Sequence, residues 1–232
     1  MRYWLSWNGT NCREKGIRLQ EMPQIVRPEE RVTHIEIPGR SGELTITEDD
    51  DIYNSYIQTI PLIVDNAADV HGAESWLRGS GYVTFCSQPE LKQDARVINA
   101  VEFRKHSWNS SWWEAQAQFY CQPLKELITE ESIVVTEDTY WVTNPGDVAS
   151  RPLITIEGSG TISLRISERE MILYNTQSGW VIDCENEWVL NNGVPLTGVY
   201  TGEFPRFLPG YNLMQFTGNV TKLTINGRWR YL

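Results

Sequence analysis

Apolar and polar residues alternate with a period of two along much of the chain, which is the side-chain spacing of a β-strand. Residues 32–37 (VTHIEI) alternate in this way and predict a strand. Residues 113–120 (WEAQAQFY) do the same and predict the returning strand of a hairpin whose turn lies in residues 104–111. Its apolar face comprises Trp113, Ala115, Ala117 and Phe119. The first half of the chain therefore indicates an antiparallel β-structure.

Residues 43–47 and 52–64 predict two further strands on either side of the acidic stretch 48–51 (EDDD). Pro38-Gly39 and Ser41-Gly42 predict a tight loop just before them. The acidic stretch could be a calcium loop, but it lacks the alternating oxygen ligands and central glycine of such a loop. We therefore interpret it as the solvated tip of a hairpin.

One segment has the 3.6-residue period of a helix. Val70, Ala73, Trp76 and Leu77 fall on one face of a helix near residues 67–79, which suits packing against a sheet. Asn66 or Asp69 can cap its start, and Gly79 or Gly81 can end it.

The second half predicts short strands at 153–157, 161–166, 171–174, 179–190, 194–199, 211–217 and 220–225. Asn192-Gly193 predicts a hairpin turn, because both positions tolerate the positive φ that such turns need. Asn144-Pro145-Gly146-Asp147 is a strong turn signal, so we place a domain junction in residues 144–152. The predicted fold is mainly β: a sandwich or barrel-like domain with one α-helix in residues 1–145, and a β-sandwich in residues 146–232.

Charge and hydropathy narrow the range of functions. The 232 residues include 20 Lys and Arg against 30 Asp and Glu, a net charge of −10, which argues against a surface that grips nucleic-acid phosphates. The start, MRYWLSWNGTN, lacks the apolar run of a signal peptide, and no window approaches a membrane span. Cys12, Cys86, Cys121 and Cys184 form no CxxC pair. We therefore expect reduced cysteines, no metal site and no membrane segment.

Candidate chemistry is sparse. His34, His71 and His106 are scattered, and no motif of a hydrolase, metalloprotease or phosphate loop is present. Asp183, Glu185 and Glu187 would share one face of a strand at about the separation of a glycosidase acid and base. Such carboxylates need different environments to separate their pKa values. We favour a solvated strand face, with Trp180, Ile182 and Cys184 directed inward, and assign no catalytic or cofactor-binding residue.

Aromatic residues are abundant, with ten Trp and ten Tyr. Of Trp108, Trp112 and Trp113, the last two point to opposite faces of a strand, so at most one of them joins a given sugar-stacking platform. In GEFPRFLPGYNLMQF, residues 202–216, Pro205 and Pro209 exclude a central strand. We expect a rigid corner that covers a sheet edge, with Phe204, Phe207 and Leu208 packed beneath it and the side chain of Asn212 holding the turn.

Several motifs stand in an order that resembles one known family. They are LSWNGTNCREKGIRL (5–19), IPGRSGEL (37–44), WLRGSGYVTF (76–85), AQFYCQP (117–123), NPGDVASRPLITIEGSG (144–160), VIDCE (181–185) and residues 202–216. In this order, and from end to end, they resemble the distal tail protein (Dit) family of long-tailed phages that lack a contractile sheath. Cys12 stands where that family commonly has Ser.

The resemblance implies a virion structural protein at the tail tip, not an enzyme. It implies a homohexameric ring of N-terminal domains and a galectin-like C-terminal β-sandwich outside the ring. Its partners would be the tail tube protein, the tail-tip or fibre protein and a receptor-binding protein. Two alternatives stay open: a carbohydrate-binding module in the C-terminal sandwich, and a glycosidase acting through the strand that carries Asp183, Glu185 and Glu187. A ring with net negative charge would also let DNA pass without binding it.

Overall fold

The computed structural model describes residues 3–47, 51–105 and 107–232. The chain divides into two compact units, residues 1–128 with Leu232 and residues 129–231. Both are built mainly of antiparallel strands, and the described residues contain one α-helix. The sequence places the domain junction at residues 144–152. The second unit instead starts earlier, because residues 133–135 and 139–144 pair with a strand near the C-terminus.

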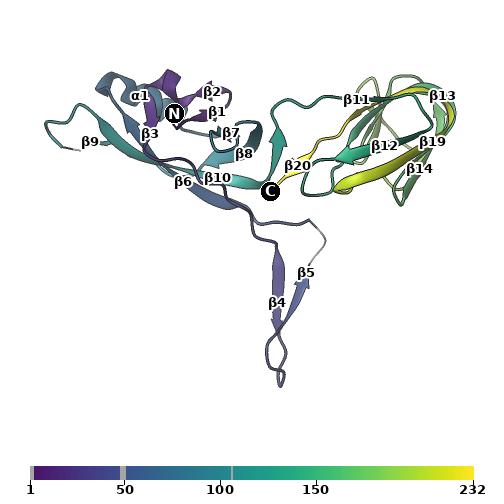
Figure 1. Ribbon diagram of the computed structural model, residues 1–232, viewed down its shortest axis with the longest axis horizontal. Coiled ribbons are helices and arrows are strands. Elements are labelled where there is room, and N and C mark those ends of the chain that lie inside the picture. The colour runs from purple at the N-terminus through teal and green to yellow at the C-terminus, as the bar shows by residue number, and fades with distance from the viewer. Residues whose placement is uncertain (1–2, 48–50, 106) are drawn as a thin grey trace. The chain divides into compact units, whose positions relative to one another are not determined.

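The first unit is a curved antiparallel sheet (Figure 1). Its strands run in the order β2-β1-β7-β8-β10-β6-β3, and β9 pairs with β10. The elements of this unit, with the short 3₁₀ helix η1, are β1 (Leu5–Trp7), β2 (Thr10–Asn11), η1 (Cys12–Lys15), β3 (Ile17–Leu19), β4 (Val32–Glu36), β5 (Glu43–Thr47), β6 (Tyr56–Val64), α1 (Ala67–Trp76), β7 (Ser80–Phe85), β8 (Leu91–Val97), β9 (Arg104–Lys105) and β10 (Trp113–Leu127). The predicted hairpin is confirmed, since β9 pairs with β10, but its turn starts later than the predicted residue 104, because Arg104 and Lys105 form β9 and Lys105 pairs with Trp113.

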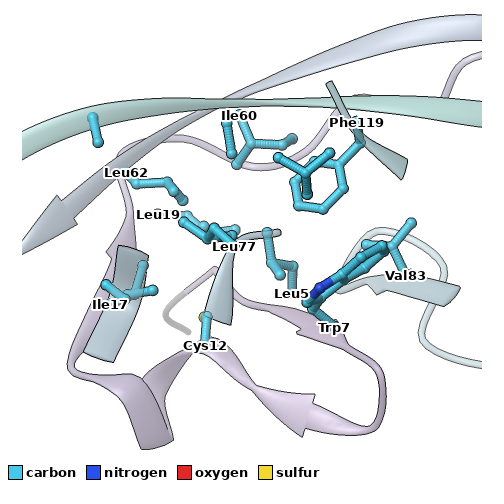
Figure 2. Packing of buried hydrophobic residues seen from close by; sticks show 14 of the residues in the cluster. Leu5, Trp7, Cys12, Ile17, Leu19, Ile60, Leu62, Leu77, Val83 and Phe119 are labelled. Carbon is cyan, nitrogen blue, oxygen red and sulfur yellow. The ribbon is translucent and has the colours of Figure 1, made fainter. Parts of the chain in front are cut away.

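The core of the first unit lies on one face of this sheet (Figure 2). The rings of Trp7 and Phe119 meet edge to face at 5.4 Å between centroids. Ala73 of helix α1 and Leu77, directly after the helix, are buried in this core, in agreement with the predicted apolar face. Asn66 is the N-cap residue but makes no side-chain cap hydrogen bond, and the helix ends at Trp76, before either predicted glycine.

Strands β4 and β5 form a two-stranded ribbon of their own (Figure 1). The sequence predicts that residues 43–47 and 52–64 form a hairpin around the acidic stretch, and this is wrong. Residues 43–47 pair with β4 across the Pro38-Gly39 turn, in which Gly39 has φ 83° and Arg40 N–H donates to the Ile37 carbonyl at 3.1 Å. Strand β6 pairs with β10 and β3 instead. Of the acidic stretch, residues 48–50 lie outside the described residues.

The second unit is built around two long strands, β13 (Leu153–Ile166) and β19 (Gly210–Asn226), which pair along most of their length. The sheet runs in the order β11-β19-β13-β15-β16-β17, while β12 pairs with β19, and β14 with β13 and β18. The remaining elements are β11 (Ile133–Val135), β12 (Thr139–Asn144), β14 (Arg169–Thr176), β15 (Trp180–Asp183), β16 (Trp188–Asn191), β17 (Val194–Leu196), β18 (Tyr200–Gly202) and β20 (Arg230–Tyr231).

Each long strand replaces two predicted strands: residues 153–157 and 161–166 both lie in β13, and residues 211–217 and 220–225 both lie in β19. Glycine explains how each strand continues without a break. The register between β13 and β19 shifts near Gly158 and Gly218. A Cβ at Gly218, whose φ is 105°, would lie 2.5 Å from the Thr161 carbonyl oxygen. The strands can therefore bend here and stay close only because a side chain is missing. The predicted Asn192-Gly193 turn is confirmed: Asn191 pairs with Val194, and the two turn residues have φ of 49° and 78°.

Candidate functional site

The three carboxylates that the sequence places on one strand face do not lie on one strand, although the structure brings Asp183 and Glu185 together on Arg228. Strand β15 ends at Asp183, and residues 184–187 form the turn to β16. Asp183 itself is buried, with 7% of its surface exposed, so the predicted solvated position is wrong for this residue. The inward direction of Trp180, Ile182 and Cys184 is confirmed by their burial.

The Asp183 carboxylate is held by an arginine and by its own turn. Its Oδ1 accepts from Arg228 Nη1 at 2.7 Å and from the Glu185 N–H at 3.2 Å, and its Oδ2 accepts from Asn186 Nδ2 at 2.8 Å. Burial raises the pKa of Asp183, but hydrogen bonds from Arg228 and Asn186 outweigh burial and lower the pKa below its ordinary value. This carboxylate therefore stays ionised and is unsuited to act as a general acid.

Glu185 belongs to the same ion-pair cluster. It contacts Arg228 at 3.3 Å and Arg230 at 2.8 Å, and its side chain is 44% exposed. The cluster ties the β15–β16 turn to the C-terminal residues of the same unit. It is a structural clamp, because the two carboxylates share Arg228 and so lack the separate environments that a glycosidase acid and base require.

The corner of residues 202–216 is held by two buried asparagines. Asn212 Oδ1 accepts from the Leu208 N–H at 2.8 Å, and its Nδ2 donates to the carbonyls of Leu208 at 2.7 Å and Gly210 at 3.0 Å. Asn144 Nδ2 donates to the Phe207 carbonyl at 3.0 Å. The predicted role of Asn212 is confirmed.

The packing under this corner is mostly as predicted. Phe204 and Phe207 are buried, and the Phe207 ring meets Trp229 edge to face at 5.7 Å. Leu208 was expected to pack beside them, but it is 41% exposed, because the turn held by Asn212 points it outward. Backbone hydrogen bonds join Phe207 to Ser150 in both directions.

The tryptophans of residues 108–113 do not form one platform. Trp108 is 85% exposed at the hairpin turn, whereas Trp113 packs against the core of the first unit.

The cysteines are free, and burial raises the pKa of Cys121 and of Cys184 to about 12 each. Within the described ranges no group of His, Cys, Asp and Glu could hold a metal ion, and His106 lies outside those ranges. The same ranges contain no helix that is both long and apolar enough to cross a membrane.

The β4–β5 ribbon is amphipathic and bare. Ile35 lies directly opposite Leu44, and Ile46 lies on the same face. With Ile37 they form an apolar face whose four side chains are between 38% and 42% exposed. We call these four residues the ribbon face. A two-stranded ribbon is only marginally stable in water, so a face of this kind calls for a partner.

A second uncovered feature is the edge of strand β6. This strand pairs with β10 from Tyr56 to Val64 but with β3 only from Leu62 to Val64. Gln20 N–H donates to the Pro61 carbonyl at 3.1 Å, so the odd-numbered residues of β6 direct their backbone groups to the β3 side. No described residue makes a backbone hydrogen bond to Ile57 or Thr59 on that side. We call residues 56–60 the open edge.

A groove lies beside the open edge. It has a volume of about 270 Å³ between residues 21–26 and residues 57–61. Gln58 Nε2 donates to the Gln24 carbonyl at 2.8 Å across it. Met22 and Ile57 line the groove and are 49% and 54% exposed, and Ile25, in the same segment as Met22, is 62% exposed. Sequence reasoning missed this site. The one signal was Pro61, because proline in a strand favours an edge.

Neither a protein-family model nor a curated protein matches the chain. A search of solved structures finds the Dit protein (gp 19.1) of SPP1, described as a paradigm of the hub adsorption apparatus in phages that infect Gram-positive bacteria. The TM-score is 0.79 at 16% sequence identity, and the match covers 100% of both chains. The motif order that suggested the resemblance thus corresponds to a shared architecture over the whole length. The chain has the fold of a phage distal tail protein.

Proposed function

We propose that this protein is a structural subunit of a phage tail tip, present in the virion and without enzymatic activity. Copies associate into a homohexameric ring that joins the tail tube to the tail-tip or fibre protein and to a receptor-binding protein. The likeness to the SPP1 hub protein over the full length of both chains supports this role. The ionised, arginine-bound Asp183 argues against the glycosidase alternative.

The ribbon face carries the proposal. Four exposed aliphatic side chains on a free ribbon are costly in water unless another surface covers them. The open edge offers unpaired backbone groups over five residues, the length of β4 and of β5. A strand of a second copy can add to this edge, while its aliphatic side chains cover Met22, Ile25 and Ile57. Two different surfaces then meet at each contact, and such head-to-tail contacts can close into a ring.

Native mass spectrometry across a concentration series tests this assembly. We expect a species of about 160 kDa, six copies of the 26.7 kDa chain. Leu44→Lys places a charge on the ribbon face and should leave the chain monomeric. Thr45→Lys is the matched control, because the neighbouring position lies on the polar face of the same strand and should leave the ring intact.

The outcomes separate the ring from its interface. A strict monomer at every concentration would contradict spontaneous ring closure. Rings that persist in Leu44→Lys would keep the ring but exclude the ribbon face as its contact.

A further inference from the structure

The outer face of β12 and β19 presents two exposed aromatic side chains. Trp141 lies opposite Leu213 and Thr143 opposite Tyr211, so all four share one face. The alternate positions Val142 and Met214 are buried, which shows that this face is the outer one. Trp141 is 61% exposed and Tyr211 is 80% exposed.

The two aromatic residues are diagonal neighbours in the strand pair. Diagonal positions on two neighbouring antiparallel strands lie about 7–8 Å apart, a distance that aromatic side chains can bridge. The backbone beside Tyr211 is fixed, because the side chain of the next residue, Asn212, holds the preceding turn with three hydrogen bonds. A backbone that is already ordered loses little conformational entropy when this face binds a ligand.

A row of polar side chains flanks the pair. Thr139 lies opposite Gln215, Gln215 opposite Arg165, and Arg165 opposite Glu170, so the row crosses four strands on the same outer face. All four side chains are exposed. Ser163 Oγ donates to Glu170 Oε1 at 2.7 Å and orients this carboxylate. The row offers hydroxyl, amide, guanidinium and carboxylate groups beside the aromatic rings.

The charges on this face select among ligands. Within the row, the one cation and the one anion, Arg165 and Glu170, lie opposite each other, so the row carries no net charge, although the whole chain carries −10. A phosphate or an acidic peptide needs an excess of cations, which this row does not supply. A stable protein interface buries about 800 Å² on each partner, far more than two aromatic rings supply.

A neutral sugar fits the combination of exposed aromatic rings and polar side chains on this face. Its ring has an apolar face that stacks on an aromatic side chain, and its hydroxyls pair with amide, guanidinium and carboxylate groups. We propose that Trp141 and Tyr211, with the row Thr139–Gln215–Arg165–Glu170, form a binding site for neutral oligosaccharides. The site lies within the second unit and does not depend on ring formation.

A glycan array of neutral and anionic oligosaccharides, probed with the full-length protein, tests the site. We expect neutral hexose or N-acetylhexosamine probes to bind. Trp141→Ala and Tyr211→Ala should each weaken the best probe by about tenfold, the effect of truncating a central aromatic residue, as measured by titration. Trp141→Phe keeps a ring and should retain part of the affinity.

Trp188→Ala is the matched control. Trp188 is 52% exposed in the same unit but lies on β16, opposite Asp183, away from the row. Its replacement should leave binding unchanged. Absence of any neutral probe above background, binding of anionic probes only, or an equal loss in Trp188→Ala would each overturn the proposal.

Discussion

At the scale of single residues, Asp183 shows why burial in the second unit could not be predicted from the local sequence alone. Alternation along the sequence correctly predicted that Trp180, Ile182 and Cys184 face inward, because each is apolar. The same alternation placed Asp183 in solvent, because Asp183 is charged, and this prediction was wrong. The partner that makes burial tolerable, Arg228, lies 45 positions away along the chain. No local pattern contains that information, since only the fold brings the two residues together.

The Asp183–Arg228 pair should make stability depend on pH. The pKa of Asp183 is lower in the folded chain than its ordinary value, so the pair stabilises the fold above the ordinary pKa of an aspartate. That contribution is lost as the pH falls through the lower, folded-state pKa. Arg228→Ala should therefore lower the opening free energy of β15 and β16 by roughly 2 kcal/mol at pH 7, between the values for surface and buried pairs. The deficit should shrink towards pH 3.

Hydrogen exchange of β15 and β16 measures this effect locally, which is useful in a chain of two units. Lys222→Ala is the control, because Lys222 pairs with Glu157 at the surface, with side chains 38% and 45% exposed. It should cost less than 1 kcal/mol, roughly, at either pH. An Arg228→Ala deficit that is the same at pH 3 as at pH 7 would show that Asp183 is not the group responsible.

At the scale of elements, the sequence predicted which helices and strands exist better than it predicted which strands pair. The helix and the Asn192-Gly193 hairpin have local signals, and both were found. The partner of residues 43–47 was assigned incorrectly, because β-pairing depends on which surfaces meet and not on the strand's own pattern. The open edge was missed for the same reason, since an edge is defined by a strand that does not come beside it.

The bend in β13 and β19 supplies a test at this scale. Gly218→Ala combines a φ of 105° with a Cβ only 2.5 Å from the Thr161 carbonyl oxygen. Gly160→Ala has a similar φ of 82°, but its Cβ would meet nothing within 4 Å. The second change should cost about 1 kcal/mol, from backbone conformation alone. The first should cost about 2–4 kcal/mol, because the strands must also move apart.

Scanning calorimetry of the two variants makes the comparison. We expect Gly218→Ala to lower the Tm of the affected transition by several times the shift of Gly160→Ala. Equal shifts would mean that positive φ, and not the close approach of the two strands, is what requires glycine at the bend.

At the scale of the whole molecule, the features that matter are surfaces that the chain leaves uncovered. Alternation predicted that Ile35 and Ile37 share a face, but an apolar face normally indicates a core. Only the structure separates the ribbon, whose apolar face is bare, from β10, whose apolar face is buried. The same holds for Trp141 and Tyr211, which look like any other aromatic residues of a β-rich chain until the register of β12 and β19 places them together.

If rings form head to tail, two variants with different defective surfaces should form one contact with each other and no more. Leu44→Lys spoils the ribbon face and keeps the open edge, whereas Ile57→Lys keeps the ribbon face and spoils the rim of the groove. Each variant alone should be monomeric. A mixture retains one sound contact per pair, between the ribbon of one variant and the edge of the other, and every further contact is blocked. Native mass spectrometry should then find a mixed dimer of about 53 kDa, twice the 26.7 kDa chain, and nothing larger. Full rings in the mixture would mean that the ring closes through other surfaces, and a mixture without dimers would mean that ribbon and edge do not meet.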